Sequence, residues 1–355
     1  MFLALGSYSV SKAAPFRVLG FYTPYAQMGD AAHAAYALEA NNWFRSVSTA
    51  NGFIYDSTTN WGDLNATKLA NYKVIMFLDN LPGDGNQRTA LQTYVTNGGG
   101  WIGFHVSAFN QDPSAWDWYF NQFLAMGSYK NNTWAPTTAI LRVEDTTHAI
   151  TRGFHKLFTG PVNEWYGWMN DLRQNTNIKI LCSIDSTSYP LGTGTGSGGA
   201  SEIWQKNSGY HPVIWTNKNY KMMYSNIGHD DVNYSTRVGL TKTFTDTQYA
   251  RLVLNAIQYC AGVTTSIEGS QPILHTAMDA AVVMTVKNDN RFVFVTLGNA
   301  GNLSATLSDV KGCVLRRASG TGGMCSMERN NIKSGVYIVS VRTSTGVTSR
   351  TVCLN

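Results

Sequence analysis

The 355-residue sequence has few charged residues and no concentrated run of them. Only 14% of its residues are charged, and the net charge of +5 is spread along the chain without a cluster of lysine and arginine. Nucleic-acid binding needs clustered positive charge, so we expect no nucleic-acid partner. No stretch approaches the ~20 consecutive apolar residues of a transmembrane helix, so we also expect no membrane span.

The sequence also lacks the cysteine spacing of metal and redox motifs, and it lacks phosphate-binding loops. The five cysteines contain no C-x-x-C pair, which argues against zinc-ribbon and thioredoxin-like folds. Three of them, Cys313, Cys325 and Cys353, lie near the C-terminus, which suggests a disulfide such as Cys313–Cys325. The glycines at 98–100 precede an apolar run instead of following one, so they form a turn and not a cofactor loop. Nucleotide cofactors are therefore not indicated.

Apolar and aromatic residues are abundant. Hydrophobic residues make up 43% of the chain, with 10 Trp, 18 Tyr and 15 Phe. This composition supports a buried core, and aromatic rings can also stack on sugars. Residues 1–15 look like the remnant of a signal peptide, with a short apolar stretch and small residues before Pro15. We therefore expect a secreted or cell-surface protein, with the periplasm as an alternative.

Between residues 16 and 262, apolar runs alternate with helical patterns. This alternation predicts an α/β domain with a parallel sheet and helices on both faces. The expected strands are 16–22, 73–78, 101–104, 139–143, 178–184, 212–215 and 221–226, and the expected helices are 31–45, 87–96 and 246–260. From 263 to 355 helical patterns disappear and short alternating runs at 281–286, 291–296 and 335–341 predict a small β-sandwich.

Two histidines follow glycine-containing strand ends, where ligands gather in parallel sheets. His105 follows the run 101–104, and His229 follows 226–228. Both suit a general base or a ligand of a divalent metal such as zinc. His33, His148 and His211 also occupy helix starts and strand ends. For each of these three, a local cap or hydrogen bond is the commoner role.

His105 also lies in a segment with the outline of a nucleophile elbow, Gly103–Ser107. In acyl transfer that turn would carry cysteine or serine. Cys182 and Cys260 instead lie in apolar segments, where a thiol is usually an inert core residue. We therefore do not expect a cysteine-dependent amidotransferase.

Glu164 is surrounded in sequence by Trp165, Tyr166 and Trp168. Aromatic walls would raise the pKa of the carboxyl by desolvation and suit a general acid. A glutamate at a helix start, with its aromatic neighbours in the core, fits equally well. Asp230 orients His229 or caps a helix. The predicted catalytic residues are His105, Glu164, His229 and Asp230, and the predicted substrate-binding residues are His33, Asn80, Trp134, Trp165, Tyr166 and His211.

Five segments in this order resemble the ThuA-like (trehalose utilisation) family: 96–105, 143–153, 163–166, 212–215 and 224–230. The resemblance covers roughly residues 16–262. It implies a flavodoxin-like domain related to class I glutamine amidotransferases, without their catalytic cysteine. It also implies a carbohydrate context such as disaccharide or keto-sugar metabolism. Near the C-terminus, segments 307–316 and 332–339 resemble the sorting domain of type IX secretion, which implies contact with secretion machinery.

Three functions remain open from the sequence. The first is an exported enzyme, a hydrolase or lyase that acts on a glycan or a keto-disaccharide by His/Glu acid–base or metal-assisted chemistry. The second is a non-catalytic glycan-binding module. It would use an aromatic rim formed by Trp116, Trp118, Trp134, Trp165 and Trp168. The third is a structural surface protein with a vestigial pocket.

Overall fold

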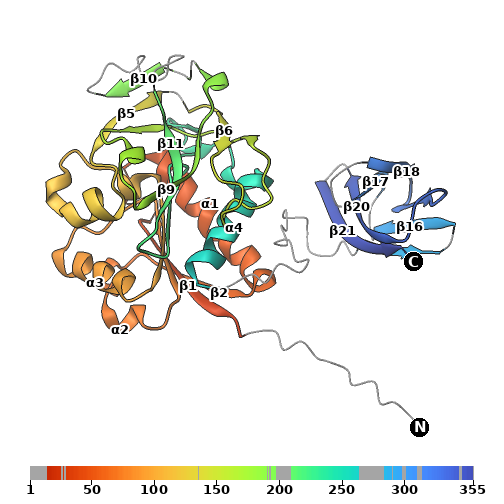
Figure 1. Cartoon of the computed structure of the whole chain (residues 1–355), viewed down its shortest axis with the longest axis horizontal. Helices are drawn as coiled ribbons and strands as arrows, with labels where there is room; N and C mark the ends of the chain where they lie inside the picture. The colour runs from red at the N-terminus through yellow and green to blue at the C-terminus, as the bar shows by residue number, and fades with distance from the viewer. Residues whose placement is uncertain are drawn as a thin grey trace, which may run out of the picture. The chain divides into compact units, whose positions relative to one another are not determined.

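The computed structural model describes residues 14–24, 27, 29–134, 136–189, 191, 193–196, 209–263, 284–289, 291–297, 301–309, 314–343 and 346–354. The chain divides into two compact units, Met1–Leu274 and His275–Asn355 (Figure 1). Almost all of the expected signal-peptide remnant, 1–13, lies outside the described residues.

The first unit is built on a nine-stranded sheet whose first half is parallel. Its order is β2-β1-β3-β4-β12, and every neighbouring pair in this half runs parallel. This is the 2-1-3-4-5 strand order of flavodoxin-like proteins. The strands are β1 (Phe16–Tyr22), β2 (Phe53–Thr58), β3 (Val74–Leu78), β4 (Gly100–Phe104) and β12 (Met222–Ser225). The mixed α/β class expected from the sequence is confirmed.

The second half of the sheet is antiparallel, which the expected all-parallel sheet did not include. Strands β11, β9, β6 and β7 continue the sheet beyond β12, each antiparallel to its neighbour. Residues 218–221 alone join β11 to β12, and a parallel crossover needs about a dozen residues or more. The bounds are β6 (Ile140–Val143), β7 (Leu157–Thr159), β9 (Ile178–Ile184) and β11 (Pro212–Asn217).

Helices cover both faces of the sheet (Figure 1). Side chains alternate along each strand, so Val74, Met76 and Leu78 of β3 join one core cluster and Ile75 and Phe77 join the other. The first cluster includes side chains of α1 and α4, and the second includes those of α3. The helices are α1 (Ala31–Ser48), α2 (Ala66–Leu69), α3 (Gly85–Thr96) and α4 (Thr247–Cys260).

Smaller elements stand around the carboxyl edge of the parallel strands. A three-stranded sheet contains β10 (Thr193–Gly196), β5 (Tyr129–Trp134) and β8 (Tyr166–Trp168), and β13 (Val232–Asn233) pairs with β14 (Val238–Gly239). A 3₁₀ turn at His105–Ala108 follows β4, and a π-helix spans Trp118–Phe123. In the described part of the chain, no helix is both long and apolar enough to cross a bilayer.

The C-terminal unit consists of two small antiparallel sheets, β15-β16-β19 and β18-β17-β20-β21. Val293 of the first sheet and Leu307 of the second belong to one core cluster, so the sheets share a hydrophobic interior. Residues 281–283 of the expected first strand lie outside the described residues. The strands are β15 (Met284–Asn288), β16 (Phe292–Leu297), β17 (Leu303–Asp309), β18 (Val314–Gly320), β19 (Met324–Glu328), β20 (Gly335–Thr343) and β21 (Gly346–Leu354).

The expected Cys313–Cys325 disulfide is wrong. Cys325 is a free cysteine in β19, and Cys313 lies outside the described residues. Spacing in the sequence suggested the pair, but the position of a cysteine on a strand decides which thiols can meet.

Candidate active site

The turn after β4 places His105 in a strained backbone conformation. Its φ is +42°, a left-handed value that a β-carbon-bearing residue rarely adopts. Two glycines make room for this turn. A β-carbon on Gly228 would lie 2.5 Å from the β-carbon of His105, and one on Gly103 would overlap the ring of Trp101. The elbow expected from the sequence is therefore present, with histidine at the residue that follows the strand, and its side chain is fully buried.

Three contacts fix the orientation of the His105 ring. Nδ1 lies 2.7 Å from the carbonyl oxygen of Asn226, so this nitrogen carries the proton and donates. The ring of Tyr166 stacks on it, with centroids 3.8 Å apart. The hydroxyl of Tyr224 donates to the His105 carbonyl at 2.9 Å. In the neutral ring, Nε2 is therefore left with a lone pair.

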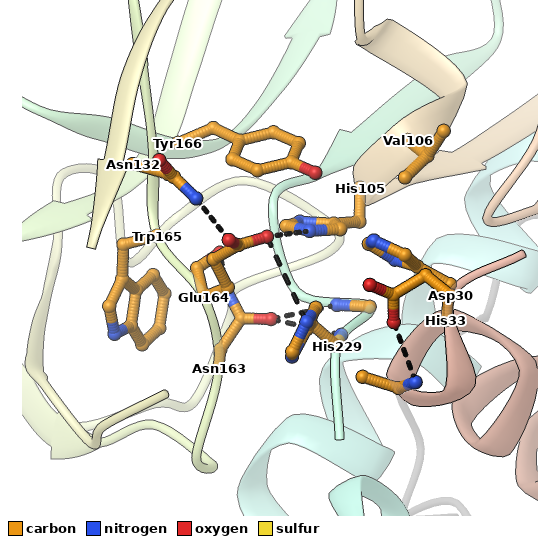
Figure 2. A network of polar contacts seen from close by, with 12 residues as sticks. Asp30, His33, His105, Val106, Asn132, Asn163, Glu164, Trp165, Tyr166 and His229 are labelled. Carbon is orange, nitrogen blue, oxygen red and sulfur yellow. Dashed lines mark hydrogen bonds and ion pairs between the residues drawn. The ribbon is translucent and has the colours of Figure 1, made fainter. Parts of the chain in front are cut away.

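Glu164 faces that nitrogen. Its Oε2 lies 3.4 Å from Nε2 of His105 and 3.9 Å from Nε2 of His229 (Figure 2). The other oxygen, Oε1, accepts a hydrogen bond from the Asn132 side chain of β5. Only 5% of Glu164 is exposed, and burial raises the pKa of its carboxyl, although His229 and His33 oppose the shift.

The contact between Glu164 and His105 favours a shared proton. Burial lowers the pKa of His105 to about 4, while the pKa of Glu164 is raised. A carboxylate oxygen and an imidazole lone pair repel each other unless one of them is protonated. Such a coupled pair can hold one proton close to the sheet edge. A buried group that keeps a proton beside a base is suited to general acid–base catalysis.

His33 and Asp79 form a second contact at this edge. His33 lies in the first turn of α1, and its Nδ1 is 2.6 Å from Oδ2 of Asp79. Asp79 follows β3 with a φ of +59°, and its Oδ1 accepts from the backbone N–H of Val106 at 2.9 Å. Burial alone would lower the pKa of His33, but the Asp79 carboxylate outweighs it and raises the pKa to about 9.

His229 completes a cluster of three histidine rings, which we call the histidine cluster: His33, His105 and His229. The ring of His33 lies 4.8 Å from that of His229 and 5.3 Å from that of His105, centroid to centroid. Burial and the neighbouring His33 lower the pKa of His229 to about 3. Residues from α1, β4 and the loop after β12 therefore meet at one place.

Two asparagines hold the loop that carries His229. The Asn163 side chain accepts from the backbone N–H groups of Gly228 at 3.0 Å and His229 at 3.1 Å. The Asn226 side chain bonds to both the N–H and the carbonyl of Tyr166. Both asparagines are buried, so these bonds tie the Glu164 segment to the end of β12.

Several predicted site residues meet in this cluster, and others lie elsewhere. His33, His105, Glu164, Tyr166 and His229 come together (Figure 2). Asn80 is adjacent to Asp79, and its side chain bonds to Thr23 and to the N–H of Leu81. His211 packs edge-on against Tyr189, with centroids 5.7 Å apart. The side chain of Trp134 lies outside the described residues.

The aromatic rim is largely core. Trp165 is fully buried, and its indole N–H donates to the carbonyl of Thr137. It lies on the side of Glu164 away from the histidines (Figure 2). Trp116 and Trp168 are buried as well. The sequence left two roles open for the aromatic neighbours of Glu164. The structure has the second of them, in which these side chains pack into the core.

Asp230 turns away from the histidine rings. Its Oδ1 accepts from the hydroxyl of Thr243 at 3.0 Å. Burial, and then the nearby Glu39, raise the pKa of Asp230 to about 8. These contacts are with the 3₁₀ turn before α4 and with α1, and not with the imidazole of His229.

Sequence reasoning assigned no role to several residues that shape the site. Asp30 is the N-cap of α1, and Asp79 directly follows β3. Asn132, Asn163 and Asn226 support the site through hydrogen bonds between distant segments. Asp30 has a weak signal, because an N-cap aspartate stands three residues before His33 on one helix face. The asparagine pairings have no signal in a single sequence.

A second groove lies at the opposite edge of the sheet. It has a volume of about 780 Å³ and is lined by α2, α3 and the residues before β4 and β12, such as Tyr72, Tyr94 and Lys221. Its described lining residues include no histidine and a single carboxylate, Asp84. Because ligands of doubly wound sheets bind at the carboxyl ends of the strands, we place the functional site at the histidine cluster.

The fold and site together define a doubly wound α/β protein whose buried histidines and carboxylates meet at the carboxyl edge of the parallel strands. The chain belongs to the ThuA family, described as trehalose utilisation, and the family model matches residues 25–260. The family resemblance seen in the sequence is thereby confirmed.

A solved structure with 33% sequence identity supports this assignment. A ThuA-like protein from Bacteroides uniformis is 33% identical, with a TM-score of 0.61, and the alignment covers 72% of this chain and 95% of that chain. A ThuA-like protein from Parabacteroides merdae is 16% identical, with a TM-score of 0.48, covering 70% of this chain and 90% of that one. No protein with a curated description matches the chain.

Proposed function

We propose that this protein is an enzyme that acts on a carbohydrate, a hydrolase or lyase whose substrate is a glycan or a keto-disaccharide. The observation that carries the proposal is the buried contact of Glu164 with His105 and His229, at 3.4 and 3.9 Å. The family's link with trehalose utilisation supports a sugar as the substrate class.

The chemistry follows from the proton balance of the pair. Glu164 with its raised pKa donates a proton to the leaving oxygen of a sugar, and the carboxylate then formed takes a proton back from water or from a sugar carbon. His105, with its proton fixed on Nδ1, presents Nε2 as a base or as an acceptor for a hydroxyl. Tyr166 and Asn226 keep this nitrogen in place.

Glycan binding without catalysis is the second candidate. It would rest on stacking of sugars against exposed aromatic rings. Three of the five tryptophans proposed for such a rim, Trp116, Trp165 and Trp168, are buried. Strained and desolvated groups at the strand ends favour the catalytic proposal, because strain of this kind concentrates at active sites.

The decisive variant is Glu164→Gln, which keeps the shape of the side chain and removes its proton transfer. On a panel of disaccharides, including trehalose and keto-disaccharides, we expect kcat/KM to fall at least ~100-fold, the usual contribution of general acid–base catalysis. Glu144→Gln is the matched control, since Glu144 bonds to Ser183 on β9, away from the cluster. Its rates should equal those of the unchanged chain.

Two results would overturn the proposal. Equal rates for Glu164→Gln and Glu144→Gln would remove Glu164 from the chemistry. Sugar binding by calorimetry without turnover of any panel member would favour the binding module.

We also propose that the protein is exported, with the C-terminal unit as its sorting domain and a secretion machinery as its partner. The proposal is supported by the small antiparallel sheets of that unit and by the sequence segments 307–316 and 332–339.

A further inference from the structure

Asp30 brings a carboxylate to the histidine cluster. One ligand atom each of Asp30, His33 and His229 lies within 4.8 Å of the others. Figure 2 shows the Asp30 carboxylate between the rings of His33 and His229. Two imidazoles and one carboxylate are the protein ligands of many catalytic zinc and non-haem iron sites. Ligands at ~2.1 Å from an ion stand about 3.4 Å apart, so small side-chain rotations would close this trio.

His33 is held in the orientation that a metal ligand needs. Its Nδ1 is bound to Oδ2 of Asp79 at 2.6 Å, which leaves Nε2 for another partner. A carboxylate behind the distal nitrogen is the usual support of a metal-binding histidine, because it fixes the tautomer and the ring. Asp79 is itself fixed, since its Oδ1 accepts from the N–H of Val106.

One proposed ligand residue has a ring nitrogen without a hydrogen-bond partner. Nδ1 of His229 is buried and makes no hydrogen bond among the described residues. A buried polar atom without a partner is costly, and native proteins rarely keep one without a ligand or an ordered water. Asp30 uses Oδ1 to cap α1 through the N–H of Ala32, which leaves its second oxygen available.

The charge of the site also favours a cation. Asp30, Asp79 and Glu164 all lie beside the histidine cluster, and among the described residues none of them pairs with lysine or arginine. Buried carboxylates are costly unless they are paired or coordinate a metal. His33 already pairs with Asp79, and Glu164 lies beside His105, so a divalent ion would chiefly balance the carboxylate of Asp30.

A second trio, His33, Asp79 and His105, also satisfies the distance criterion. Both oxygens of Asp79 are already committed, one to His33 and one to Val106. The trio with Asp30 therefore has more free ligand capacity. The sequence predicted His105 and His229 as metal ligands. The trio with Asp30 includes His229 but not His105.

We propose that Asp30, His33 and His229 bind a divalent transition-metal ion, with Asp79 as the positioning residue of His33. The inference deepens the proposed function and rests on the same site. A divalent ion held by this trio would lower the pKa of a bound water. Glu164, whose Oε2 lies 3.9 Å from Nε2 of His229, would be the neighbouring carboxyl that exchanges a proton at the site.

Metal content and affinity test this site without any assay of turnover. The full chain, free of any histidine tag, is stripped with a chelator and titrated with Zn²⁺ by calorimetry, and the bound zinc is measured by mass spectrometry. We expect one zinc per chain. His33→Gln and His229→Gln should bind none at the same concentration. Asp30→Asn should bind much more weakly, although asparagine caps α1 as well as aspartate does.

Two further variants place the metal. Asp79→Asn should keep the stoichiometry and weaken binding about 10–100-fold, as loss of a supporting group does. His148→Gln, which removes a half-buried histidine that packs on Tyr259, should bind as the unchanged chain does. Circular dichroism confirms that each variant is folded, and zinc should raise the melting temperature only of chains that bind it.

The outcomes separate this inference from the proposed function. No zinc bound by the folded, unchanged chain overturns the metal site, as does full binding by His33→Gln and His229→Gln. Loss of zinc in His105→Asn with retention in Asp30→Asn would assign the metal to the other trio and also overturn it. Zinc binding as expected, combined with no effect of Glu164→Gln on turnover, would leave the metal site standing and reject the acid–base role.

Discussion

At the scale of single residues, the site depends on two side chains held in an unfavourable backbone conformation. His105 and Asp79 both have left-handed φ angles, and both stand at the carboxyl ends of neighbouring parallel strands. Each such residue costs about 1–3 kcal/mol, and the surrounding structure must hold it there. The stacked Tyr166 and the Asn226 carbonyl do so for His105. Because His33 contacts both residues, this strain brings three side chains together.

Asp230 should make the protein less stable as the pH rises. Burial, together with the nearby Glu39, raises the pKa of Asp230 to about 8 in the folded chain, against 3.8 as the ordinary value, while Thr243 and Lys242 oppose the shift less strongly. Glu39 accepts two backbone N–H groups, from Thr243 and Phe244, which hold its carboxyl beside Asp230. The folded state therefore binds more protons than the unfolded state between pH 4 and 8, and stability falls as the pH rises through this window.

The Asp230→Asn variant measures this effect. We compare the free energy of unfolding of Asp230→Asn with that of the unchanged chain. The difference in favour of the variant should grow with pH by at most about 1.4 kcal/mol per pH unit between pH 5 and 8. Above pH 8 the difference should stay constant. Urea unfolding at pH 5, 6.5, 8 and 9 gives both curves. Parallel curves would show that Asp230 is ionised in the folded protein. Glu39→Gln is the second comparison and should reduce the slope without removing it.

At the scale of elements, the sequence predicted the site residues whose position is fixed by the end of a strand. It did not predict those whose position depends on contacts between distant segments. The Gly-Phe-His pattern at Gly103–His105 and the glycine before His229 predicted two histidines at the carboxyl edge, because each strand register places them there. The strand pattern in the sequence does not predict which loops contact one another at the edge of the sheet. The hairpin of β11 and β12, the contact of Asn163 with Gly228, and the cap at Asp30 depend on distances between segments far apart in the sequence.

The approach of the loop after β12 to the elbow after β4 gives an element-scale prediction. In Gly228→Ala, the new β-carbon would stand 2.5 Å from the β-carbon of His105. Both atoms are attached to backbone, so neither can rotate away, and one loop must move. We expect a loss of about 1–3 kcal/mol in the free energy of unfolding, as for other overpacked sites, and a fall in kcat/KM because His105 is displaced from Glu164.

Gly83→Ala is the control for that variant, since nothing lies within 4 Å of a β-carbon at this exposed position between β3 and α3. Its unfolding midpoint in urea and its activity should match those of the unchanged chain. If Gly228→Ala unfolds at the same midpoint as Gly83→Ala, the close packing of the loop on the elbow is not present in solution.

At the scale of the whole molecule, the described residues of each unit form a hydrophobic interior of their own. Two clusters on the faces of the nine-stranded sheet are built from residues between Val18 and Cys260, and a third, between Val293 and Leu354, fills the C-terminal unit. All the groups of the candidate site come from the first unit. A unit with its own core can fold alone, so the proposed catalysis and the proposed sorting role belong to separable parts.

Separately produced fragments should therefore each keep the properties of their own unit. Fragment 1–274 should unfold cooperatively in urea and bind zinc with the affinity of the full chain, because Asp30, His33 and His229 lie within it. Fragment 275–355 should fold to β-structure by circular dichroism and bind no zinc.

The sorting role is tested by export of a reporter protein. Fused to the reporter in a cell with type IX secretion, residues 263–355 should carry it outside, whereas the same reporter fused to residues 16–262 should stay inside. Loss of zinc affinity in fragment 1–274 would show that the site needs the C-terminal unit, and an unexported reporter would reject the sorting role.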